Sequence, residues 1–239
     1  MANNFFNAIK TDISADSTLP TAVYTTPVSK KSILIELDVA NKSSSGVTVS
    51  VCMCDASQNQ THSLSGTVTN ANASQVTVAS GTSGLFTTTS SAAHNLIVND
   101  RVTFTATDEP SFTDASLPPS GDTELSTATS TPTTARNRIY YVQAIGAGAS
   151  PTTFKIAESE SASAALTFDS AGTAVKMSKI HLADVVRDAP VPVGGSLKVI
   201  SGQKLVIESQ HANVNDKIFV SSSAANAVDC IASVLEDVS

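Results

Sequence analysis

The residues that could carry acid–base, nucleophilic or metal chemistry are few in this sequence, and their spacing does not bring them together. A serine nucleophile would be marked by a Gly-x-Ser-x-Gly turn, and that motif is absent. The histidines show no pairing at the spacing of a metal site, and they are His62, His94, His181 and His211. We therefore predict no catalytic residue, no metal site and no cofactor, and a chain that is not an enzyme. His94 is expected to be a hydrogen-bonded turn residue, and His181 a half-exposed structural residue in a strand.

The cysteines also favour a structural role. Cys52 and Cys54 stand two positions apart in an expected strand, so they share a face and cannot easily bridge each other. Without a second pair or a nearby histidine, they are a weak metal signal. We expect them and Cys230 to be buried or half-buried free thiols in a protein that folds in a reducing cytosol.

Glycan binding is the strongest functional alternative to a purely structural role. Sugar sites usually stack an aromatic ring on the sugar, but the chain has no Trp, and the side chains of Tyr140 and Tyr141 are expected to point to opposite faces. Glu158 and Glu160 share one face of an expected strand, where a solvated edge explains them better than a carboxylate pair for glycoside cleavage. A host surface glycan stays open as an alternative partner.

Composition limits the partners further. The 239 residues carry a net charge of −7, with only 15% charged residues. This balance argues against nucleic acid and against an anionic membrane surface, because both need an excess of Lys and Arg. No apolar run is long enough to span a bilayer, and the N-terminus lacks the basic start and apolar core of a signal peptide.

Alternating apolar residues predict an all-β fold. The clearest case is 31–40, where Ile33, Ile35, Leu37 and Val39 are expected to share one face. A polar turn over 41–46 joins this strand to another at 47–54, which predicts a β-hairpin. Further strands are expected at 22–26, 179–182, 197–200, 204–208, 217–220 and 227–235.

The hairpin and the C-terminal strands are separated by more than a hundred polar-rich residues, which predicts a discontinuous domain. Residues 1–64 and 179–239 would form an antiparallel β-sandwich of jelly-roll or immunoglobulin-like topology, and residues 65–178 an inserted small β-barrel domain. Strands of the insert are expected at 76–78, 85–86, 94–96, 100–104, 139–142, 153–156, 166–168 and 174–177. A long loop over 105–136, rich in Ser, Thr and Pro, is expected to be solvated through its acidic residues Asp108, Glu109, Asp114, Asp122 and Glu124.

Short motifs follow one another along the insert: His94-x-Leu96, Asp100-x-Val102-x-Phe104, Tyr140-Tyr141-Val142 and Phe154-x-Ile156. Leu117-Pro118 falls between the second and third motifs. This series resembles a small β module that recurs in structural proteins of tailed bacteriophages. The stretches 31–41, 191–197 and 227–236 resemble small phage virion proteins. The resemblance implies a structural protein of the virion that is assembled in the host cytoplasm. Its expected place in the virion is the neck or tail, and capsid decoration is a near-equal alternative.

The N-terminal residues are expected to form an arm, either extended or as a short helical turn. Phe5, Phe6 and Ile9 are its apolar residues, and they are costly to leave in water. The arm would be either a strap over the protein's own core or a docking segment that lies on a neighbour. With few lysines to block sheet edges, the chain is expected to form a homo-oligomer and to contact other virion proteins.

Overall fold

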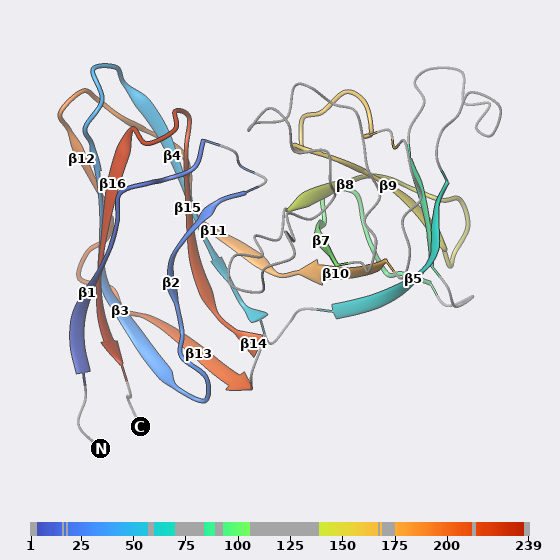
Figure 1. Ribbon diagram of the computed structural model, residues 1–239, viewed down its shortest axis with the longest axis horizontal. Coiled ribbons are helices and arrows are strands. Elements are labelled where there is room, and N and C mark those ends of the chain that lie inside the picture. Colours follow the sequence, from blue (N-terminus) through green and yellow to red (C-terminus); the bar gives the residue numbers. More distant parts are fainter. Residues whose placement is uncertain are drawn as a thin grey trace. The chain divides into compact units, whose positions relative to one another are not determined.

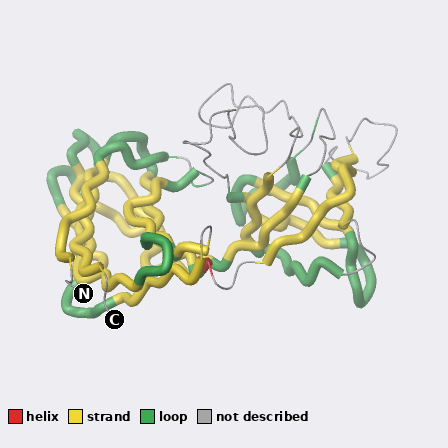
Figure 2. Tube along the Cα trace, turned by 60° about the horizontal axis from the view of Figure 1, so that its bottom comes forward, coloured by secondary structure: helices red, strands yellow, loops and turns green. Residues whose placement is uncertain are grey.

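The structure of the protein is a computed structural model, and it describes residues 4–15, 17, 19–56, 60–69, 84–88, 93–105, 139–166, 168, 175–211 and 214–236. The chain divides into two compact units. Unit 1 joins both ends of the chain, Met1–Asn59 with His181–Ser239, and unit 2 is the insert Gln60–Ile180. Strands, yellow in Figure 2, build both units. The predicted all-β fold class is confirmed.

Unit 1 is a sandwich of two antiparallel sheets. One sheet contains β1 (Asn4–Lys10), β16 (Val228–Glu236), β3 (Lys31–Asn41), β12 (Ser196–Ile200), β13 (Leu205–His211) and β14 (Val214–Asn215). The other contains β11 (Leu182–Val191), β4 (Val47–Cys54), β15 (Lys217–Ser222) and β2 (Thr21–Thr25). Because the inner faces of both sheets are apolar at alternate positions, they close over one core. The first and last strands of the chain, blue and red in Figure 1, lie side by side.

The face that β3 turns towards this core changes partway along the strand. Leu34 and Leu37 are both fully buried although they are three positions apart. The reason is a β-bulge at Ile35, where the register between β3 and β16 shifts by one residue. The prediction that Ile33 and Ile35 share one face with Leu37 and Val39 is therefore wrong. Ile33 lies on the outer face of the sheet and is half-buried.

Unit 2 is a ring of six antiparallel strands whose pairing closes on itself. In order around the ring they are β10 (Lys176–Ile180), β5 (Gln60–Thr69), β6 (Leu85–Thr88), β9 (Thr153–Ala157), β8 (Tyr140–Ile145) and β7 (Arg101–Thr105). Phe86 lies at the centre of the core, with its ring stacked on Phe104 at 4.9 Å and on Phe154 at 5.0 Å between centroids. The unit thus has a core made of its own residues only.

Two segments link unit 1 to unit 2. The strands that they join are paired with each other within each unit. Cys54 at the end of β4 lies opposite Leu182 at the start of β11. Gln60 at the start of β5 lies opposite Lys179 near the end of β10. The boundaries between the units fall at 59/60 and 180/181. The predicted boundaries at 64/65 and 178/179 lie inside β5 and β10, because the polar sequence of β5 gave no strand signal.

Some predicted elements differ from the structure or lie beyond its description. Residues 94–96 and 166 are not in strands; Leu96 and Leu166 reach the core of unit 2 from loops, His94 is buried, and Asn95 is exposed. The expected strand at 76–78 and Leu117-Pro118 lie outside the described residues. The same holds for the loop predicted at 105–136 after Thr105, with all five of its acidic residues.

Candidate functional site

The N-terminal residues predicted to form an arm are an edge strand of the protein's own sheet. β1 pairs with β16 over seven consecutive residues without a shift in register. Phe6 and Ala8 face inward and pack against the core of unit 1. Phe5 and Ile9 point outward, and each is 60% exposed. The arm therefore covers the core with one face, as a strap would, and leaves two large apolar side chains in solvent on the other.

Phe5 begins an apolar row that crosses the outer face of the sheet. It lies opposite Leu235 of β16, Leu235 lies opposite Ile33 of β3, and Ile33 lies opposite Val206 of β13. Side chains directly opposite in antiparallel strands have Cβ atoms about 4.5–5.5 Å apart, so these four are neighbours. Val206, at the far end, is 52% exposed. We call these four residues the outer apolar row.

Ion pairs border this row. Lys31 and Glu208, each two residues from the row along β3 and β13, lie 3.3 Å apart. Glu36 and Lys198 lie 2.6 Å apart on β3 and β12. The hydrogen bond to Glu36, with smaller contributions from the charges of Glu36 and Asp38, raises the pKa of Lys198. An apolar centre with a polar border is the usual anatomy of a protein–protein interface.

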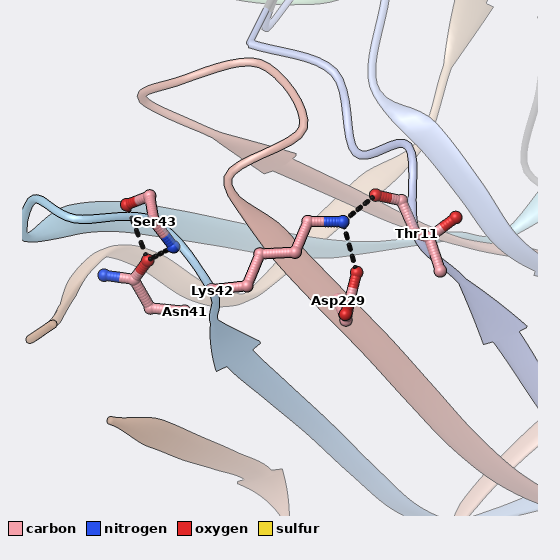
Figure 3. A network of polar contacts seen from close by, with 5 residues as sticks. All are labelled: Thr11, Asn41, Lys42, Ser43 and Asp229. Atoms are coloured by element: carbon pink, nitrogen blue, oxygen red, sulfur yellow. Dashed lines mark hydrogen bonds and ion pairs between the residues drawn. The ribbon is translucent and has the colours of Figure 1, made fainter. Parts of the chain in front are cut away.

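A polar network holds the end of β1 against the sandwich (Figure 3). The Lys42 ammonium donates to the backbone oxygen of Thr11 at 3.0 Å and to the Asp229 carboxylate at 2.7 Å. Next to it, the Asn41 side-chain oxygen accepts from both the backbone N–H and the hydroxyl of Ser43. The contact of Lys42 with Thr11 holds the chain where it leaves β1, so the exposed side chains of the strand are presented in a defined position.

The inner face of β1 lies beside a buried hydroxyl. The rings of Phe6 and Tyr24 lie 6.1 Å apart, and the Tyr24 hydroxyl donates to the Glu236 carboxylate at 2.7 Å. It also shares a hydrogen bond of 2.8 Å with the Ser32 hydroxyl. Burial, above all, raises the pKa of Tyr24. β1 is thus held by packing as well as by its pairing with β16.

In unit 2, His94 is a turn residue, as predicted. It is fully buried; its Nδ1 accepts from the Leu96 N–H at 3.0 Å, and its Nε2 lies 3.0 Å from the Thr153 carbonyl oxygen. Because Nδ1 accepts, the proton of the neutral ring is on Nε2, which donates. Asp100 accepts from the Ile97 N–H at 2.8 Å and pairs with Lys179 at 2.7 Å. These polar residues therefore support the turn that leads into β7.

The aromatic and acidic candidates for sugar chemistry do not converge. Tyr140 is fully buried, whereas the half-buried Tyr141 has the Arg101 guanidinium 5.7 Å from its ring centroid. The adjacent tyrosines face opposite ways, as predicted. The prediction that Glu158 and Glu160 share a strand face is wrong, because β9 ends before them and they lie in the following turn.

The remaining candidates for chemistry stay apart. His181 is exposed between β10 and β11 rather than half-exposed within a strand, while the side chains of His62 and His211 are not described. Cys52 is half-buried, Cys54 and Cys230 are buried, and none of these three cysteines is in a disulfide. Across the described ranges, no three His, Cys, Asp or Glu residues gather as they would around a metal ion. Nor does any helix there have the length and apolar character needed to cross a membrane.

Comparisons with protein-family models, with curated proteins and with solved structures found no match to this chain.

Proposed function

We propose that this chain is a non-enzymatic structural component of a tailed phage virion. Its place is the neck or tail, with decoration of the capsid surface as the near alternative. The observation that carries the structural role is the outer apolar row, which runs across four strands of one sheet and starts at the N-terminal edge strand. Its partners are copies of itself and other virion proteins, and assembly takes place in the host cytoplasm.

A surface of this kind favours assembly over chemistry. Contiguous apolar patches are rare on monomeric proteins and mark contacts with other molecules. The row lies on paired strands rather than on loops, so its side chains are held in place before a partner arrives, and less conformational entropy is lost on binding. Phe5 and Val206 at its two ends are more than half exposed.

The phage setting rests on the sequence motifs of the insert. Leu96, Val102, Phe104 and Phe154 from those motifs are all buried in the single core of unit 2. Such motifs support a fold rather than an active site, which agrees with a structural module. The acidic, weakly charged composition of the whole chain suits a particle component better than a protein that binds nucleic acid.

Incorporation into particles tests this proposal. A phage that encodes this chain would be made to carry Val206→Lys, which places a charge on the outer apolar row without touching β1. Val193→Lys is the matched control, because Val193 is 59% exposed and lies in a turn of the same unit, away from the row. We expect Val206→Lys to reduce the amount of the chain per particle several-fold and Val193→Lys to leave it unchanged. Equal incorporation of the two variants would show that the outer apolar row does not mediate assembly into the particle.

A further inference from the structure

The edges of the sandwich are not equally protected against pairing with another strand. β11 carries two irregularities in register, a left-handed residue at Asp188 (φ 48°) and a proline at Pro190. β2 is five residues long and is followed by Pro27. β12 has a shift in its pairing, and β14 has only two residues. Bulges, prolines and short lengths are the usual means of blocking an edge.

β1 has none of these protections along its described length. It has seven residues and no proline, keeps a regular register with β16 and carries one charge, Lys10, at its end. No other strand pairs with its second edge among the described residues. It therefore offers a regular row of backbone donors and acceptors, as a strand that accepts a neighbour does.

The pattern of apolar and polar residues along β1 is symmetric about Asn7. Its outer face is apolar, polar, apolar, with Phe5, Asn7 and Ile9. If two copies pair antiparallel about Asn7, Phe5 of each copy lies opposite Ile9 of the other. On the inner face Phe6 then meets Ala8, and Lys10 meets Asn4, so no like charges lie opposite each other.

We propose that two copies of this chain associate by antiparallel pairing of their β1 strands, with Asn7 on the twofold axis. This register is the one that pairs all seven residues of each strand and places apolar side chains opposite each other on the outer face. It also continues the outer apolar row across the seam, because Ile9 of the second copy lies beside Phe5 and next to its own Ile231. The inference specifies the self-contact of the protein proposed above as structural. It rests on that role but is tested separately, on the purified chain.

A charge exchange tests the register. In the variant Phe5→Lys/Ile9→Lys the pairing would set lysine opposite lysine twice, whereas in Phe5→Glu/Ile9→Lys it would set glutamate opposite lysine. Sedimentation equilibrium is expected to show a dimer for the native chain, at least a tenfold weaker dimer for the first variant, and a restored dimer for the second. Val193→Lys should leave the dimer unchanged. A monomeric native chain, or two double variants that dimerise equally, would overturn the proposal.

A disulfide trap tests the axis. Opposite residues of antiparallel strands have Cα atoms about 4.5–5.5 Å apart, within the range of a disulfide. Asn7→Cys in a Cys52→Ser background should therefore cross-link two copies under mild oxidation at least ten times faster than Ile9→Cys. In the proposed register the two Ile9 positions would be about 13 Å apart, four residues along the strands. Equal rates would overturn the proposal. A chain that fails both tests but is present in particles would overturn this contact and leave the structural role standing.

Discussion

Phe5 and Phe6 are adjacent in sequence but point to opposite faces of β1. Phe6 lies against the core beside Tyr24, whereas Phe5 is 60% exposed and begins the outer apolar row. The same short strand thus closes the protein's own core and presents an apolar surface. Stability and assembly should respond to different residues of it.

Truncating each phenylalanine separates these roles. We expect Phe6→Ala to lower the free energy of unfolding by about 1–3 kcal/mol, below the loss for a fully buried ring because Phe6 is only partly buried. Phe5→Ala should cost less than about 1 kcal/mol, since its side chain is mostly in water. Urea unfolding of both variants measures the difference. Equal losses would mean that β1 does not pack as described.

Asp216 provides a second test of stability in unit 1. It is buried, and its carboxylate accepts from the Ala56 N–H and from the Glu208 N–H, each at 2.9 Å. In Asp216→Asn one of these donors would face an amide NH₂, so we expect a loss of about 1–3 kcal/mol. Asp229→Asn is the control, because the exposed pair of Asp229 with Lys42 should contribute less than about 1 kcal/mol. Similar losses for both would contradict the role of Asp216.

Unit 1 should lose stability at alkaline pH. Burial, more than the nearby charge of Asp38, raises the pKa of the Cys230 thiol from 9.0 to about 12, and the pKa of Tyr24 is raised from 10.0. Above about pH 9 the unfolded chain releases protons that the native chain keeps, so the free energy of unfolding falls as pH rises. This contribution is fully present at neutral pH. Urea unfolding between pH 7 and about 10.5 should show the fall, and Cys230→Ala or Tyr24→Phe should flatten it. An unchanged slope in both variants would exclude these groups as its cause.

Unit 1 should fold without the insert. Cys54 and Leu182 lie opposite each other where the chain leaves and re-enters the unit, so a short link can replace residues 60–180. The two cores share no residue. We expect the shortened chain, joined by a few Gly and Ser residues, to give a cooperative urea transition and a β-type circular dichroism spectrum. An unfolded product would show that the units depend on each other.

Strand positions were predicted well from the sequence where apolar residues alternate over a long stretch. The buried face of a strand was predicted poorly where a β-bulge interrupts it. The hairpin of β3 and β4 was predicted nearly to the residue, because apolar residues recur at every second position over 33–39 and over 47–53. Its buried face was misassigned because Ile33, Leu34 and Ile35 are all apolar, and only the pairing with β16 shows where the register shifts.

The candidate site could also be predicted only in part from the sequence. Phe5, Phe6 and Ile9 could be selected because they are apolar residues in a polar stretch. Their division between two faces depends on the pairing of β1 with the other end of the chain. Ile33, Leu235 and Val206 were missed, since each lies in an apolar strand. Their alignment in one row depends on pairing between strands that are distant in the sequence.

The central claim is that the chain is a structural part of a phage particle. Quantitative mass spectrometry of purified, nuclease-treated particles of a phage that encodes it tests this claim most directly. We predict that the chain is present in multiple copies per particle, in a fixed ratio to the other structural proteins and resistant to washing with high salt. Its absence from the particles, or amounts that vary from one preparation to the next and disappear on washing, would contradict the claim.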